Sequence, residues 1–197
     1  MPKKYLTAKV KHGEEKIIKY TGEELCAQIE NARYNLKKYP CIVDNSTGYL
    51  KHLVILPLYH VFGFIAVFLW FSFFNTTFVF PSSLASNRIR EAAIIGEPSC
   101  IFAVPLFWNS IANSVEKVVK SKNAEELFEK GIRASERIQK VAPLKGAKFV
   151  RNKLFKKYLD NIFGTTIHFC ISGGSSISKN TLRIINGLGY PLVNGFG

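Results

Sequence analysis

The sequence predicts an α/β fold in which strands alternate with helices and build a largely parallel sheet covered by those helices. Short apolar runs recur along the chain, and most are separated by ten or more residues of helical pattern, which is what a crossover between parallel strands needs. The 197 residues suit one domain, and a hydrophobic fraction of 47% with 16 Phe excludes a disordered chain.

The first predicted helix covers residues 22–38. Thr21 and Glu24 have the spacing of a capping box, in which a hydroxyl and a carboxylate satisfy the first amides of a helix, and apolar residues then recur at helical spacing. Pro57 lacks an N–H donor and ends the first strand. The strands are predicted at 53–57, 75–81, 100–105, 166–172 and 190–194. The further helices are predicted at 88–95, 107–121, 124–141, 147–162 and 178–188.

The most apolar stretch, 58–74, allows two interpretations. Joined to the strand before it, the run is long enough to cross a bilayer, so a small membrane-associated protein anchored by 53–74 is one of them. Pro57, His60 and Gly63 interrupt the run, however, and no second span follows. These interruptions favour a core helix that is apolar all round because it is covered all round.

Charge and cysteine usage narrow the class of protein. The net charge is +13, and the densest basic run is 145–158, which suits an anionic membrane surface, a phosphate backbone or a solvated helix face. Zinc-finger spacing and an aromatic RNA-binding pattern are both missing, so we expect no nucleic-acid partner, while peripheral membrane contact stays open. The four cysteines are scattered and lie at no metal-ligand spacing, which predicts reduced thiols, no metal held by them and a cytoplasmic protein without a secretory signal.

Ligands of parallel sheets bind beyond the carboxyl ends of the strands. Three such ends stand out, at 57–60, 105–108 and 172–176. In the last, Gly173 and Gly174 let the backbone turn sharply and approach a ligand, and free amides at a helix start favour an anion. A plain tight turn explains the same residues, and the segment is neither a Walker loop nor a dinucleotide fingerprint. His60 fits a hydrogen-bonded core position as well as a site, and the nucleophile motif G-x-S-x-G of hydrolases is missing.

Four segments in one order carry a family resemblance. They are LPLYHVFG at 56–63, VPLFWNSI at 104–111, ISGGSSIS at 171–178 and LGYPLVNGFG at 188–197. In this order and spacing the chain resembles the adenylate-forming acyl-CoA synthetases, the AMP-dependent synthetase and ligase family, specifically over 50–197 and more weakly over 5–50. The resemblance implies a partial adenylation domain over 1–197, an incomplete piece of the large N-terminal domain of such an enzyme.

The resemblance also implies an activity and a set of site residues. A carboxylate, a fatty acid by the abundance of Phe, would be activated with ATP and Mg²⁺ as acyl-AMP and transferred to coenzyme A. The implied nucleotide-binding residues are Lys3, Gly173, Gly174, Ser175, Asn194, Gly195, Phe196 and Gly197, with Phe196 stacking on adenine. The implied acyl-pocket residues are Tyr59, His60 and Trp108.

The two ends of the chain match parts of two family motifs. The start, MPKK, resembles the tail of a phosphate loop of the form S-G-T-T-G-x-P-K, and the end matches the start of Y/F-G-x-T-E, whose Glu helps to hold Mg²⁺ in the family. We therefore expect no complete catalytic set, no small C-terminal domain and no turnover by this chain alone. A non-catalytic adenylate-binding module is the alternative that stays open beside the membrane protein.

Overall fold

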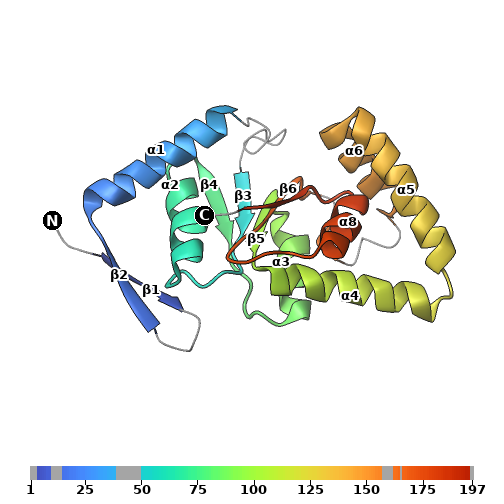
Figure 1. Ribbon diagram of the computed structural model, residues 1–197, viewed down its shortest axis with the longest axis horizontal. Coiled ribbons are helices and arrows are strands. Elements are labelled where there is room, and N and C mark those ends of the chain that lie inside the picture. Colours follow the sequence, from blue (N-terminus) through green and yellow to red (C-terminus); the bar gives the residue numbers. More distant parts are fainter. Residues whose placement is uncertain (1–3, 10–14, 39–49, 157–161, 165, 196–197) are drawn as a thin grey trace.

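A computed structural model describes residues 4–9, 15–38, 50–156, 162–164 and 166–195 (Figure 1). Five strands form a parallel sheet in the order β4 (Thr76–Val79), β3 (Leu50–Leu53), β5 (Cys100–Ala103), β6 (Phe169–Ser172) and β7 (Leu192–Asn194). Helices lie on both sides of these strands in Figure 1. The predicted α/β class with a largely parallel, helix-covered sheet is confirmed.

The side chains of the strands alternate between two hydrophobic layers, as the pleat requires. One layer contains Ile101 and Cys170 and packs against α3 (Ser86–Gly96), α4 (Pro105–Ser121), α5 (Glu125–Val141) and α8 (Lys179–Gly187). The other contains Phe102 and Ile171 and packs against the segment that follows β3. Two separate layers of buried side chains on one sheet make this a three-layer domain.

The apolar stretch 58–74 forms the helix of the second layer. It folds into a wide π-helix, η2 (Phe62–Leu69), continued by one turn, α2 (Trp70–Ser72), with Ile65, Val67 and Phe71 buried. In the part of the chain described above, no helix is both long and apolar enough to span a membrane. The stretch packs on the sheet as a core helix, but Phe68 and Phe73 are exposed, so it is not covered all round.

The predicted N-terminal helix is confirmed as α1 (Gly22–Lys38), with its capping box formed. The amide of Thr21 donates to Glu24 Oε2 at 2.6 Å and the amide of Glu24 donates to Thr21 Oγ1 at 3.2 Å. The bond from the Thr21 amide, together with one that the Thr21 hydroxyl donates to the same carboxylate oxygen at 3.0 Å, holds the pKa of the Glu24 carboxyl below its usual value. The box is local chemistry, which is why the sequence could predict it.

Three elements differ from expectation. Residues 4–20 contain a hairpin of β1 (Lys4–Lys9) and β2 (Glu15–Tyr20), an antiparallel pair that was not predicted. The helix expected at 147–162 begins earlier, as α6 (Pro143–Phe149), and continues as η3 (Val150–Leu154); Pro143 suits a first helical position because its missing N–H needs no partner there. Strand β3 is Leu50–Leu53 instead of 53–57, although the amide of Val54 still donates to Val79 O at 2.9 Å.

Candidate functional site

The candidate site lies along one edge of the sheet, where four neighbouring parallel strands end. The loops after β3, β5, β6 and β7 all leave from this edge, because parallel strands point the same way. Tyr59 and His60 follow β3, Gly173 to Ser175 follow β6, and Asn194 ends β7 with Gly195 after it. The fold therefore brings to one edge of the sheet segments that are more than a hundred residues apart in the sequence.

A reversal of strand order occurs between β3 and β5. The chain after β3 enters η2 on one face of the sheet, whereas the chain after β5 enters α4 on the other face. Adjacent strands whose connections leave to opposite faces open a crevice between their carboxyl ends, which is where ligands of open α/β sheets bind. The glycine loop after β6 is next to this reversal, since β6 pairs with β5.

The glycine loop is tied to both neighbouring strands. The amide of Gly173 donates to Ala103 O of β5 at 3.1 Å, and the amide of Gly195 donates to Ser172 O at 2.7 Å. Gly174 has a φ of 85°, a left-handed conformation that favours glycine, and the nearest atom to a Cβ built there is Val104 Cγ1 at 3.9 Å. Open space beside the Gly174 backbone allows a ligand to approach it.

Polar groups of this loop are available to a ligand. Ser175 is exposed, and Ser172 Oγ beneath it is buried with no hydrogen-bond partner in the described part of the chain. A buried hydroxyl without a partner is uncommon in folded proteins and is typical of places where a ligand or water completes the bonding. The loop therefore presents polar groups that a ligand could contact.

Tyr59 and His60 follow β3, on the other side of the point where the strand order reverses. Tyr59 is 73% exposed, and His60 is half-buried. The amide of Phe62 donates to His60 Nδ1 at 3.3 Å, so the proton of the neutral ring is placed on Nε2. The local backbone bond from the His60 amide to Pro57 O, at 3.1 Å, turns the chain from the strand into η2. His60 is thus an oriented hydrogen-bond donor.

Trp108 is placed apart from these two residues. It is fully buried in the layer that contains α4, edge-on to Phe107 at a centroid distance of 5.2 Å, and its indole N–H donates to Ile171 O at 3.3 Å. Its bond fastens the start of α4 to β6 below the glycine loop. The structure therefore groups Tyr59 with His60 at the edge and puts Trp108 in the core of the other layer.

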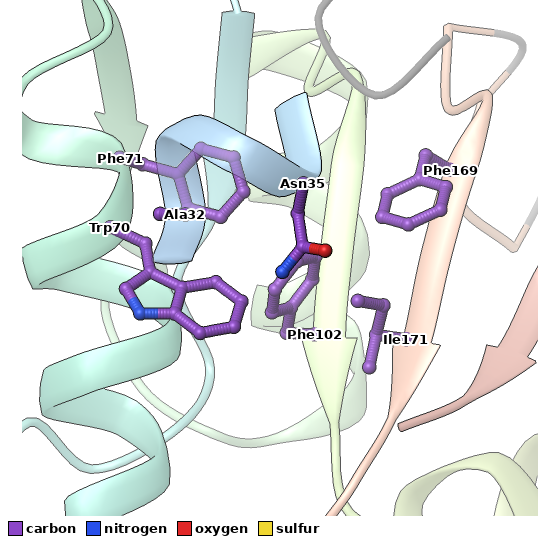
Figure 2. A pocket seen from close by; sticks show the side chains of 7 residues that line it. All are labelled: Ala32, Asn35, Trp70, Phe71, Phe102, Phe169 and Ile171. Atoms are coloured by element: carbon purple, nitrogen blue, oxygen red, sulfur yellow. The ribbon is translucent and has the colours of Figure 1, made fainter. Parts of the chain in front are cut away.

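An apolar hollow that the sequence did not indicate lies between the second-layer helices and the sheet (Figure 2). Its volume is about 30 Å³. It is lined by Ala32 and Asn35 of α1, Trp70 and Phe71 of α2, Phe102 of β5, and Phe169 and Ile171 of β6. Figure 2 shows the Asn35 amide pointing in among these apolar side chains. Only the alternation of Phe169 and Ile171 along β6 could have suggested that they share a face.

Some expected features cannot be placed. Lys3, Phe196, Gly197 and Cys41 lie outside the described residues. Cys26, Cys100 and Cys170 are free thiols, and burial raises the pKa of the Cys100 and Cys170 thiols. The described ranges contain no group of three or more His, Cys, Asp or Glu side chains that could hold a metal ion. We assign no step to Mg²⁺.

Comparison with known proteins supports the fold and not more. No family model matches the chain, and no characterised protein matches it by sequence. Among solved structures, the A-PCP didomain of carboxylic acid reductase from Segniliparus rugosus, in complex with AMP, matches 98% of this chain with a TM-score of 0.64 and 16% identity. O-succinylbenzoate coenzyme A synthetase (MenE) from Bacillus subtilis, in complex with ATP and magnesium ion, matches 98% with a TM-score of 0.59 and 14% identity.

A third match is the N-terminal domain of FACL13 from Mycobacterium tuberculosis, with a TM-score of 0.56, 14% identity and 98% of this chain covered. The chain spans 22% of the reductase didomain, 29% of MenE and 36% of the FACL13 domain. The chain therefore has the fold of part of the adenylate-forming enzymes.

Proposed function

We propose that this chain is part of a ligase that activates a carboxylate with ATP as an acyl-adenylate and passes the acyl group to coenzyme A. The observation that carries the proposal is the reversal of strand order between β3 and β5, with the glycine loop of β6 at the same carboxyl edge. Solved structures with this fold include complexes with AMP and with ATP, which supports a nucleotide at that edge.

The adenylate would lie along the ends of β6 and β7. Backbone amides and carbonyls of Gly173, Gly174 and Ser175 would contact the adenine and the carboxylate end, and Asn194 and Gly195 would lie near the base. Phe196 would stack on the adenine, with Gly197 beside it, and Lys3 would contact phosphate. In the reaction, a carboxylate oxygen attacks the α-phosphorus and pyrophosphate leaves, so cations and backbone amides must face phosphate oxygens whose charge increases.

The acyl group would enter at the carboxyl edge of the sheet, beside Tyr59 and His60. From there it would lie between η2 and β6, in the direction of the hollow of Figure 2, whose lining is apolar. Trp108 would support this pocket from beneath through its bond to Ile171 O. Trp70 and Phe102 line the hollow and would bound the acyl group on that side.

Calorimetry with AMP and with an acyl-sulfamoyl adenosine tests the proposal on the full chain. We expect binding, and we expect Gly174→Val to remove it, because a side chain there fills the space beside the backbone. Gly164→Val is the matched control: Gly164 also has a positive φ, 71°, and open space around its Cβ position, but it does not lie at the carboxyl edge.

Three outcomes would be informative. No binding by a chain that circular dichroism shows to be folded would refute the proposal. Equal loss in Gly174→Val and Gly164→Val would mean that strain, and not the site, explains the effect. Pyrophosphate release by the chain with any acid in a panel would contradict the expectation that this chain alone does not turn over.

A further inference from the structure

We propose that the outer face of α6 and η3 docks onto an anionic membrane surface. This face, called here the basic–apolar face, consists of Leu144, Lys145, Lys148, Phe149 and Lys153. All five side chains are exposed, with Leu144 at 48% and Phe149 at 54%. They recur three and four residues apart, so they share one side of the helix.

The opposite side of the same helix is packed into the protein. Gly146, Ala147, Val150 and Arg151 are buried, and Gly146 lies so close to α5 that a Cβ on it would approach Ile138 O to 3.0 Å. The split between a buried side and an exposed side fixes which residues face outward. Figure 1 shows α6 and α5 at the end of the molecule opposite to the β1–β2 hairpin.

The charge of this region has one sign. Residues 137–156 contain no Asp or Glu, and their cations are Arg137, Lys140, Lys145, Lys148, Arg151, Lys153 and Lys156. Within the described residues, Lys145, Lys148 and Lys153 form no ion pair. Their charge is therefore not neutralised inside the protein, and it is complementary to a surface of phosphate and carboxylate groups.

The exposed apolar residues favour a membrane over a nucleic acid as the anionic partner. A face that only attracts phosphates needs no exposed Leu144 or Phe149, which cost hydration without contributing to a Coulomb attraction. A bilayer surface accommodates both kinds of side chain. The apolar side chains of Phe149 and Leu144 would enter the boundary between headgroups and acyl chains. The methylene stems of the lysines would lie beside them, with their ammonium groups at the lipid phosphates. The observed interleaving fits this second surface.

Hydrogen bonds of the buried Arg151 hold α6 and η3, and with them the basic–apolar face, away from the candidate site. Its guanidinium donates to the carbonyl of Ile167 and to that of Gly189, the latter at 3.2 Å. Ile167 precedes β6 and Gly189 precedes β7, so the helix is fastened to the amino edge of the sheet. The candidate site is at the carboxyl edge, and docking through α6 therefore leaves it uncovered.

Vesicle flotation with the full chain tests this docking, since aggregates sink and vesicle-bound protein rises. We expect flotation with phosphatidylcholine–phosphatidylserine vesicles at low salt, little with phosphatidylcholine alone, and loss at high salt. K145Q/K148Q should weaken partitioning by about 30-fold, from a contribution of about 1 kcal/mol per lysine. The control K117Q/K120Q removes the same charge from exposed positions of α4 and should change it far less.

Phe149→Ser separates the membrane from other anionic partners. It should reduce vesicle binding by about tenfold or more and leave binding of a single-stranded RNA oligonucleotide unchanged. Phe149→Trp should retain docking and show a blue-shifted emission with anionic vesicles. The proposal is overturned if the wild type fails to float, or if K145Q/K148Q and K117Q/K120Q weaken vesicle binding equally. It is also overturned if the chain binds RNA more tightly than vesicles and Phe149→Ser changes neither RNA binding nor vesicle binding.

Discussion

The ring of Phe62 lies directly on the backbone of Gly173. A Cβ built on Gly173 would come within 2.5 Å of Phe62 Cζ, a distance that real side chains do not tolerate. This contact joins the first turn of η2 to the glycine loop of β6. It therefore packs η2 against the glycine loop, beside the proposed position of the acyl group.

Gly173→Ala should destabilise the chain by about 1–3 kcal/mol, because the ring of Phe62 must move out of its place. Phe62→Ala should remove most of that cost, so the double variant should lose about 1 kcal/mol less than the sum of the two single changes. Urea unfolding measures all three. Gly174→Ala is the control: its cost comes from a φ of 85°, and Phe62→Ala should not relieve it. Additive free energies in the first pair would contradict the contact.

His52→Leu should stabilise the chain by about 1–3 kcal/mol. His52 is fully buried on β3, between the rings of Phe71 and Phe102 at centroid distances of 5.1 and 4.8 Å, and neither nitrogen has a partner in the described part of the chain. Leucine keeps the apolar contacts and removes two unsatisfied polar atoms. A lower midpoint of urea unfolding in the variant would refute this.

The same residue predicts a pH dependence. Burial lowers the pKa of His52 to about 3, from an ordinary value of 6.5. Between these values the unfolded chain binds the proton and the folded chain does not, so stability is lost as pH falls from about 6.5 to about 3. His52→Leu should have a flatter curve of unfolding free energy against pH in that window. Parallel curves for the two proteins would show that His52 is not the group responsible.

Trp70→Ala should widen the range of acids accepted. Trp70 lines the hollow of Figure 2, and its loss extends the apolar space along η2. We expect the affinity for a long-chain acyl-sulfamoyl adenosine to rise about tenfold relative to the short-chain analogue, through apolar area buried by the added methylenes. Phe80→Ala, which removes an aromatic ring that is 59% exposed, is the control and should leave the ratio unchanged. An unchanged ratio in Trp70→Ala would place the acyl pocket elsewhere.

Ser178→Ala should cost about 1 kcal/mol, because Ser178 Oγ accepts the amide of Thr181 at 3.0 Å and caps α8 just after the glycine loop. Thr181 Oγ1 in turn donates to Asn109 Oδ1 of α4 at 2.6 Å, so the cap is linked to the neighbouring helix. Thermal unfolding measures the loss. Ser176→Ala, at an exposed loop position, should be neutral, and equal effects of the two changes would argue against the cap.

Features that depend on neighbours in the chain could be predicted. The capping box of α1 joins residues three apart, and the helical pattern of α4 and α5 arises from one stripe of apolar residues on each. The β1–β2 hairpin was missed although its two strands are paired over six residues each, because lysines interrupt the apolar signal of both. The start of α6 was missed because Pro143 was not recognised as a first helical residue.

The candidate site likewise has features that the sequence predicted and features that it could not predict. The strand-end loops with His60 and Gly173 were predicted, since a turn after an apolar run is a local pattern. The separation of Trp108 from His60 could not be predicted, because it depends on the face to which each connection turns. The hollow under Trp70 joins α1, α2 and two strands, and no pattern within one segment indicates it.

By itself, the sequence determined the class of fold, most of the elements and the segments that end at the carboxyl edge of the sheet, because periodicity and turn chemistry act over a few residues. The tertiary structure alone decided the strand order β4-β3-β5-β6-β7, with its reversal between β3 and β5, and the placing of Phe62 on Gly173. Those depend on burial of apolar faces between segments far apart in the chain, and that free energy exists only once the layers have packed.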